Sequence, residues 1–150
     1  MLLIFDYGFT NKKIISYTFS KRMTVDCILK ALSQANQRYE ILKGLILHTD
    51  LGSQYTASEV EKWLVKNNIR HSYSRKGTPY DNAGIESFHA SPKKEEVYTT
   101  NYSDFEETNR ALFSYIEGFY NRNRIHSSID YLTPQEFEDL SKESRHNRLY

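Results

Sequence analysis

Short apolar segments alternate with amphipathic segments along the first half of this chain, and this alternation constrains the fold more than any other feature. Segments 2–5, 13–19, 45–47 and 69–73 are rich in apolar, aromatic or β-branched residues, as strands are. Apolar residues at helical spacing follow residue 24 and follow residues 56–58. Strands that alternate with helices predict an α/β fold, in which helices cover the faces of a sheet.

The helices expected in the first half have identifiable starts and apolar faces. Thr24 can cap a helix that runs from residue 25 to about residue 37, and Thr56 or Ser58 can open the next one. The residues expected on the two apolar faces are Ile28, Leu29, Leu32 and Ala35 in the first helix, and Val60, Trp63 and Leu64 in the second.

The second half contains three further expected helices. One follows Asp81 or Asn82 and meets Pro92, where we expect a kink or an end because proline removes a backbone donor. A long helix opens at Ser103, and a short one has Pro134 at its first position. The long helix should bury one stripe, which consists of Phe105, Asn109, Leu112, Phe113, Ile116 and either Phe119 or Tyr120.

The composition fits one intracellular domain outside membranes. The chain has 150 residues, of which 39% are hydrophobic and 26% charged, so a modest core can form. Its single cysteine, Cys27, excludes an internal disulfide and a multi-cysteine zinc site, and a reducing compartment is the simpler interpretation. No apolar run approaches the roughly 20 residues of a membrane span.

Basic residues gather in two segments although the formal net charge is only +1. Residues 70–94 contain five Lys or Arg against two acids, and Arg122, Arg124 and His126 lie in a stretch without acids. Basic patches of this kind fit a phosphate-bearing partner. Ordinary solvated faces explain them equally well from charge alone.

Two carboxylates stand out because each lies at the end of an expected structural element. Asp50 directly follows an apolar strand, and Glu86 lies about one turn into a helix, with 35 residues between them. Sites in α/β folds gather at the carboxyl ends of strands. A helix that crosses the sheet could bring Glu86 beside Asp50, where their oxygens would suit Mg²⁺ or Mn²⁺. Two such ions can assist an in-line phosphoryl displacement.

A plainer interpretation of the same residues stays open. Asp50 could begin a turn by accepting a hydrogen bond from the backbone of Gly52. Glu86 could be an exposed helix residue that pairs with a basic neighbour. Lys93 lies two helical turns after Glu86, so it could meet a phosphate or simply face solvent.

Four stretches of the chain resemble one known family. They are FDYGFTNKKIISY at 5–17, HTDLGSQYT at 48–56, SRKGTPYDNAGIESF at 74–88 and FYNRNRIHSSIDYLTPQEF at 119–137. Together they resemble the integrase catalytic core of bacterial insertion-sequence transposases, a DDE-type member of the retroviral-integrase-like superfamily. The resemblance covers residues 2–137 and implies a ribonuclease H-like mixed sheet flanked by helices. Residues 1–137 would form a partial core, and residues 138–150 a charged tail that frays from Ser141.

The resemblance also implies roles for individual residues. Asp50 and Glu86 match the second and third acids of the family's metal site, which holds Mg²⁺ or Mn²⁺. Lys93 matches a residue that holds substrate DNA, while the loop 74–82 matches a mobile loop beside the site. The residues expected to contact DNA are Arg75, Lys76, Asn82, Lys93, Arg124 and His126.

The first acid of the family lies on a strand that precedes the hairpin resembled by residues 2–17. Asp6 matches an aspartate of that hairpin, so the resemblance implies a sheet without its first, central strand and a site without its first acid. Three hypotheses follow: an active transposase core, an inactive remnant that binds only DNA or partner chains, or a site in which Asp6 substitutes as the first ligand.

The activity implied by the family is metal-dependent DNA cleavage and strand transfer during transposition. The implied partners are DNA, both transposon ends and target, and further transposase chains in a homo-oligomer or a mixed oligomer with full-length transposase. The implied location is the bacterial cytoplasm, at the nucleoid, with no membrane association.

Overall fold

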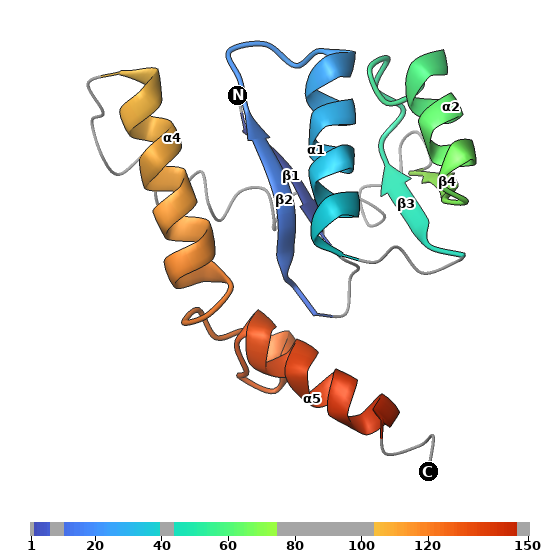
Figure 1. Ribbon diagram of the computed structural model, residues 1–150. Helices are drawn as coiled ribbons and strands as arrows, with labels where there is room; N and C mark the ends of the chain where they lie inside the picture. The colour runs from blue at the N-terminus through green and yellow to red at the C-terminus, as the bar shows by residue number, and fades with distance from the viewer. Residues whose placement is uncertain (1, 7–10, 40–43, 75–103, 147–150) are drawn as a thin grey trace. The chain divides into compact units, whose positions relative to one another are not determined.

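The computed structural model describes residues 2–6, 11–39, 44–74 and 104–146, and for residues 2–6 and 146 it describes only the backbone (Figure 1). The chain divides into two compact units, each with its own contacts. The first contains residues 1–5 and 15–87, and the second contains residues 6–14 and 88–150. The expected loop at 74–82 apart from Ser74, the helix around Glu86 and the kink at Pro92 lie outside the described residues.

The described strands of the first unit form two separate pairs. Strands β1 (Leu2–Asp6) and β2 (Ile14–Phe19) make one two-stranded sheet, and β3 (Ile46–Thr49) and β4 (Arg70–Tyr73) make the other. All four strands were predicted close to their observed bounds. Together with the flanking helices, they confirm the predicted mixed α/β class with few strands.

Helix α1 (Val25–Arg38) packs its apolar face into the core of the first unit. Its buried residues are Ile28, Ala31, Leu32 and Ala35, so Ala31 replaces the predicted Leu29 in the buried stripe. The hydroxyl of Ser16 on β2 donates a 2.8 Å hydrogen bond to the carbonyl of Ala31, which ties α1 to that strand. Thr24 occupies the predicted cap position, but its hydroxyl donates to the Cys27 sulfur and caps no backbone amide.

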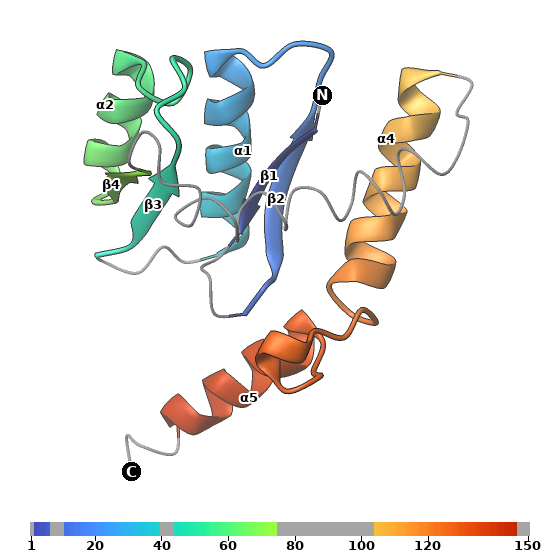
Figure 2. The ribbon, with the colours of Figure 1, turned by 180° about the vertical axis from the view of Figure 1, so that it is seen from behind.

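Strand β3, helix α2 (Ser58–Lys66) and strand β4 form a strand–helix–strand unit. The two strands run parallel, with Leu47 opposite His71 and Thr49 opposite Tyr73. Helix α2 contacts both β4 and α1, and Figures 1 and 2 show the two helices side by side. The helix begins at Ser58, one of the two predicted starts, and its cap residue Ala57 provides no side-chain hydrogen bond.

The second unit contains a continuous helix in which an α-helical part is followed by a π-helical part. Helix α4 (Phe105–Phe113) continues into a π-helical segment, η2 (Ser114–Tyr120). Asp104 caps α4, and its carboxylate accepts a 2.8 Å hydrogen bond from the Glu107 amide. The predicted stripe is right for Leu112, Ile116 and Tyr120, which are buried, and wrong for Phe105, Asn109 and Phe113, which are exposed. Thr108 and Tyr115 are buried as well, although they were not predicted.

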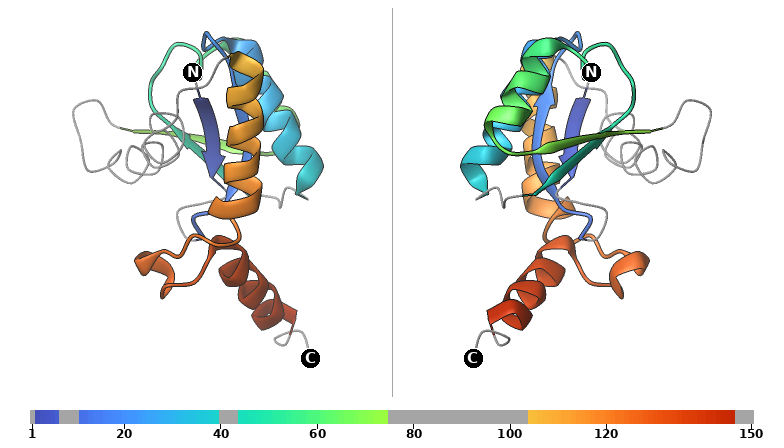
Figure 3. Two further views of the ribbon diagram at one scale, coloured as in Figure 1. Left: turned by 90° about the vertical axis from the view of Figure 1, so that its left-hand side faces the viewer. Right: turned by 90° about the vertical axis from the view of Figure 1, so that its right-hand side faces the viewer.

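The chain turns after η2, through a short 3-10 helix η3 (Ser127–Ile129), and ends in helix α5 (Pro134–His146), as both views of Figure 3 show. Pro134 is the first helical residue, as predicted. Thr133 and Glu136 bond each other's backbone amides reciprocally, at 2.8 and 3.2 Å. Helix α5 runs through the expected boundary at residue 137 and remains helical to His146, so the predicted fraying from Ser141 is wrong.

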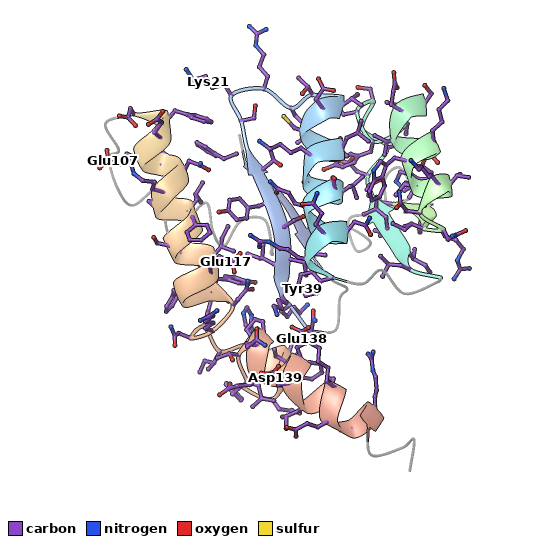
Figure 4. The ribbon with its side chains drawn as sticks, in the orientation of Figure 1. Lys21, Tyr39, Glu107, Glu117, Glu138 and Asp139 are labelled. Carbon is purple, nitrogen blue, oxygen red and sulfur yellow. The ribbon has the colours of Figure 1, made fainter. Side chains whose placement is uncertain are left out.

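Residues far apart in sequence anchor the second unit. The side-chain amide of Asn121 accepts a 3.0 Å hydrogen bond from the Ile14 N–H through its oxygen, and donates a 2.9 Å bond to the Ile14 carbonyl through its nitrogen. The buried Lys13 ammonium pairs with the buried Glu138 carboxylate and donates to Gln135. Figure 4 labels Glu138 beside Asp139 on α5. In the described part of the chain, no helix has the length and hydrophobicity to cross a bilayer.

Candidate functional site

Asp50 lies where the sequence placed it, immediately after the last residue of β3. Because β3 and β4 are parallel, their carboxyl ends meet at one edge of the pair. The amide of Ser74, which follows β4, donates a 2.9 Å hydrogen bond to the carbonyl of Thr49 and closes this edge. Asp50 is exposed there, so its carboxylate is accessible to an ion or a ligand.

A tight turn orients the Asp50 carboxylate. Its Oδ1 atom accepts a 2.8 Å hydrogen bond from the amide of Gly52, which is the bond that the plainer interpretation predicted. A Cβ atom added at Gly52 would lie 2.9 Å from Oδ1, so the Asp50 carboxylate would have to move. The described residues provide no hydrogen bond or ion pair to the other oxygen, Oδ2. The turn bond and a metal-ligand role are therefore compatible.

Tyr55 follows in the same turn and feels the charge of this carboxylate. Its amide donates a 2.9 Å hydrogen bond to the Gly52 carbonyl. Burial raises the pKa of Tyr55 to about 12, and the negative charge of Asp50 adds to the shift. Tyr55 therefore stays a neutral phenol beside Asp50 at physiological pH.

A hydrogen-bonded cluster that the sequence reasoning missed lies directly behind Asp50. The Nε2 atom of His71 lies 2.8 Å from the Thr49 hydroxyl, and its Nδ1 atom lies 2.6 Å from the Glu61 carboxylate. The Tyr73 hydroxyl also donates to Glu61. Strand register gave a possible signal, since residues 71 and 73 face the same side as residue 49 in a parallel pair.

The cluster perturbs the ionisation of its members. Hydrogen bonds from Tyr73 and then His71 hold the pKa of the Glu61 carboxyl below its usual range. Burial, followed by the hydrogen bond and charge of Glu61, raises the pKa of Tyr73 to about 12. Glu61 is thus a carboxylate and Tyr73 a neutral donor at neutral pH.

His48 lies on the opposite face of the same strand pair. Its ring nitrogens lie 3.0 Å from the hydroxyls of Ser72 and Ser74. Strand alternation explains the separation, because residues 48, 72 and 74 alternate with residues 49, 71 and 73. The two histidines therefore serve different faces of the β3–β4 pair.

The remaining predicted residues of the metal and loop site cannot be placed. Glu86, Arg75, Lys76, Asn82 and Lys93 all lie outside the described residues. Asp6 is the last residue of β1, and its side chain is likewise not described. Whether Glu86 reaches Asp50 therefore stays a prediction.

Arg124 and His126 lie together in the second unit. The Arg124 Nη1 atom is 3.1 Å from Nδ1 of His126, and the guanidinium carbon is 5.4 Å from the centre of the Tyr120 ring. The His126 ring meets Tyr120 edge-on at 5.3 Å. Tyr120 and Asn121 are buried, while Arg124 and His126 are half-buried. Tyr120 and Asn121 thus stabilise the fold, and Arg124 and His126 form a basic cluster nearer the surface.

The donor chemistry at Asp50 fits a hard divalent cation in part. The carboxylate is exposed, ends a strand and has one oxygen engaged in a turn, and oxygen is the ligand that Mg²⁺ and Mn²⁺ prefer. Among the side chains that the structure describes, no group of three or more His, Cys, Asp or Glu could hold a metal ion.

Two models of the integrase core domain match this chain. One matches residues 9–79 and the other matches residues 67–134, so together they extend from residue 9 to residue 134. The matched range includes Asp50, Glu86 and Lys93, and also the cluster of Arg124 and His126.

Curated relatives are transposases of bacterial insertion sequences. The transposase for insertion sequence element IS904 of Lactococcus lactis is 39% identical over 132 residues, which are 85% of this chain and 51% of that protein. Transposase InsF for insertion sequence IS3A of Escherichia coli is 37% identical over 129 residues, which are 86% of this chain and 45% of that protein. The chain thus spans about half the length of these relatives.

Solved structures of retroviral integrases share the fold. The catalytic core domain of BIV integrase aligns with a TM-score of 0.62 and 22% identity, and covers 93% of this chain and 84% of that domain. The HTLV-2 integrase catalytic core domain, solved in complex with magnesium, aligns with a TM-score of 0.58 and 18% identity, and covers 85% and 77%. These likenesses confirm the ribonuclease H-like class. The chain belongs to the integrase core family, as a DDE-type core of insertion-sequence transposases.

Proposed function

We propose that this chain is the catalytic part of an insertion-sequence transposase that cuts DNA and joins it to a target with the help of Mg²⁺ or Mn²⁺. The observation that carries the proposal is the exposed Asp50 carboxylate at the carboxyl end of β3, inside the range that the integrase core models match. The proposed core spans residues 1–137, and the segment 138–150 adds charged surface to it.

The proposed metal ligands are Asp50 and Glu86. Two bound divalent ions, where present, stabilise the attacking and leaving oxygens of an in-line phosphoryl displacement. Asp50 would offer its free oxygen while the Gly52 amide holds the other one. The alternative hypothesis, in which Asp6 substitutes as the first ligand, stays separate from this proposed pair.

The proposed DNA contacts come from two groups of basic and polar residues. Lys93 and the loop residues Arg75, Lys76 and Asn82 would bind phosphates near the metal ligands. Arg124 and His126 would meet the DNA backbone from their own cluster, since cations account for most non-specific affinity.

Further copies of a transposase chain are the proposed protein partners, either as a homo-oligomer or as a mixed oligomer with a full-length transposase. The proposed location is the bacterial cytoplasm at the nucleoid, because the DNA substrate lies there.

A second candidate function is non-catalytic binding of DNA or partner transposase chains. The observation that favours it is the division of the described strands into two separate pairs, β1–β2 and β3–β4. Strand edges can accept a strand from another chain, so pairs of this kind suit an assembly role.

The test is nicking and strand transfer on a pre-cut DNA end that carries an insertion-sequence terminus, with Mg²⁺ or Mn²⁺. We expect Asp50→Asn and Glu86→Gln each to abolish activity, while Asp26→Asn, which removes an exposed carboxylate from α1, retains it. An Asp6→Asn variant with full activity would reject Asp6 as a ligand. A parent protein that binds DNA but cuts nothing would refute catalysis and support the second candidate.

A further inference from the structure

We propose that Thr49, His71 and Glu61 are positioning residues that fix the backbone of Asp50 for its role at the metal site. This role rests on the proposed function, because it matters for chemistry only where Asp50 is a ligand. The hydrogen bonds themselves stand independently of that function, and they can be measured without a metal ion.

The three residues connect helix α2 to the main chain of Asp50 through a continuous series of hydrogen bonds. Glu61 Oε1 lies 2.6 Å from His71 Nδ1, and His71 Nε2 lies 2.8 Å from the Thr49 hydroxyl. That hydroxyl donates a 2.9 Å hydrogen bond to the carbonyl oxygen of Asp50. The series therefore ends on the peptide group that follows the Asp50 side chain.

Counting protons fixes the direction of each bond. The carbonyl of Asp50 can only accept, so the single hydroxyl proton of Thr49 is used there. Nε2 of His71 must then donate to Thr49. Because the pKa of Glu61 is held low, Glu61 is an acceptor, and Nδ1 must donate to it. Both ring nitrogens of His71 are therefore assigned as donors in these bonds.

Burial makes this series specific, because water cannot easily replace its members. Thr49 is 6% exposed and the His71 side chain is 5% exposed, whereas the Glu61 side chain is 40% exposed. Thr49 and His71 form the buried end of the series, and Glu61 forms the end that reaches solvent. Loss of the Thr49 hydroxyl would leave a buried N–H of His71 without an acceptor, which is costly.

Asp50 is thereby held at two points. Thr49 holds its carbonyl, and the Gly52 amide holds its Oδ1 atom at 2.8 Å. A ligand carboxylate with fixed backbone and side-chain torsions loses less entropy when it binds an ion. Supporting hydrogen bonds of this kind typically change metal affinity when they are removed.

A link that served only to join α2 to β4 would not need the hydrogen bond from Thr49 to the Asp50 carbonyl. The bonds from His71 and Tyr73 to Glu61 already join the helix to the strand. The bond from Thr49 to Asp50 lies beyond that link and adds nothing to it. A test must therefore read out Asp50 and not stability alone.

The exchange rate of the Gly52 amide in the full chain reports the orientation of Asp50 directly, because that amide donates to Oδ1. We expect Thr49→Val to accelerate exchange by about three- to tenfold, and Thr49→Ser, which keeps the hydroxyl, to restore it. The matched control is Ser72→Ala, which removes a hydrogen bond from the other face of the strand pair. Asp50→Ala sets the unprotected limit.

An unchanged Gly52 exchange rate in Thr49→Val, or an equal acceleration in Ser72→Ala, would overturn the proposal. If Thr49→Val fails to fold, His71→Asn serves instead, since its amide can replace Nδ1 toward Glu61 but leaves Thr49 without a donor. Nitrogen NMR of His71 gives a second readout. A proton on Nε2 is expected, and a lone pair there would refute the assigned bond directions.

Mn²⁺ binding to the same proteins separates this proposal from the proposed function. We expect Asp50→Asn to abolish binding and Thr49→Val to weaken it about tenfold. If Asp50→Asn binds Mn²⁺ as the parent does, the proposed function fails, and Gly52 exchange still decides whether Thr49 orients Asp50. If only Asp50→Asn weakens binding, the positioning role fails and the proposed function stands.

Discussion

Replacement of Asn121 by alanine should strongly destabilise the second unit. The Asn121 amide provides both hydrogen bonds to the backbone of Ile14, at 3.0 and 2.9 Å. Ile14 is 1% exposed and Asn121 is 3% exposed, so neither backbone group can turn to bulk water. Each unpaired buried group costs about 1–3 kcal/mol, and we expect a total loss of about 2–4 kcal/mol when a water molecule partly fills the space.

Urea unfolding followed by circular dichroism measures this loss as a change in the free energy of unfolding. The single tryptophan, Trp63, lies on α2 in the first unit, so its fluorescence follows that unit separately. The matched control is Asn123→Ala. Asn123 is exposed and donates one 2.7 Å bond to the Gly118 carbonyl, so its loss should cost less than about 1 kcal/mol. An Asn121→Ala variant as stable as this control would refute the reasoning.

Further predictions concern Asp50 and the buried ion pair. Gly52→Ala should cost less than about 1 kcal/mol but weaken Mn²⁺ binding about tenfold, because its Cβ would displace the Asp50 carboxylate. Asp50→Asn should lower the pKa of Tyr55 from about 12, yet leave it above 10 because burial persists, as a tyrosine NMR titration can show. Lys13→Met should cost about 3 kcal/mol or more at neutral pH, since it leaves Glu138 buried without that partner. Burial opposes ionisation of Glu138, but its bonds to lysine outweigh burial and lower its pKa, so this stabilisation is lost as pH falls through the acid range in urea titrations.

Each of these variants has a control within the chain. Gly44 has a φ of +88° and open space where a Cβ atom would lie, so Gly44→Ala should cost about 1 kcal/mol through backbone strain and leave Mn²⁺ binding intact. Equal Mn²⁺ affinities for Gly44→Ala and Gly52→Ala would contradict the crowding argument. Tyr73 should keep its pKa of about 12 when the aspartate is replaced. Lys142 also bonds Glu138 but is 65% exposed, so Lys142→Met should cost much less than Lys13→Met.

Local signals in the sequence predicted where most helices and strands lie. They did not predict which hydrogen bonds individual side chains form. Pro134 opens α5 as expected, because proline at a first helical position requires no tertiary partner. Thr24 precedes α1 as expected, but its hydroxyl bonds to Cys27. Whether the Thr24 oxygen accepts a bond from a backbone amide depends on side-chain torsions, which residue spacing does not encode.

The apolar stripe of the long helix was mispredicted for a geometric reason. The prediction assumed 3.6 residues per turn throughout, but η2 is π-helical, so its side chains advance differently around the axis. Tyr115, which was not predicted, is therefore buried beside the predicted Tyr120. This cause does not apply to Phe105 and Phe113, which are exposed within the α-helical part. Nothing in the local sequence marked the change of helix type.

The candidate site was predictable only in its strand-terminal residue. Asp50 follows an apolar run, and that pattern alone places it at the end of a strand. The series through Thr49, His71 and Glu61 depends on the parallel register of β3 with β4 and on the position of α2. Register is a tertiary property, so the connection between Asp50 and a histidine 21 residues further along could be foreseen only by assuming the parallel pairing of β3 with β4.

The bonds of Asn121 and Glu138 have a consequence for synthesis on the ribosome. They join residues separated by 107 and 125 positions, and the second unit is built from two segments with residues 15–87 of the first unit between them. At roughly 5–20 residues per second, about 6–25 s pass between translation of Lys13 and of Glu138. During that time the ammonium of Lys13 and the backbone of Ile14 lack the partners that they have in the folded chain. If the first unit folds during synthesis, it does so while the start of β2 still lacks its final neighbours.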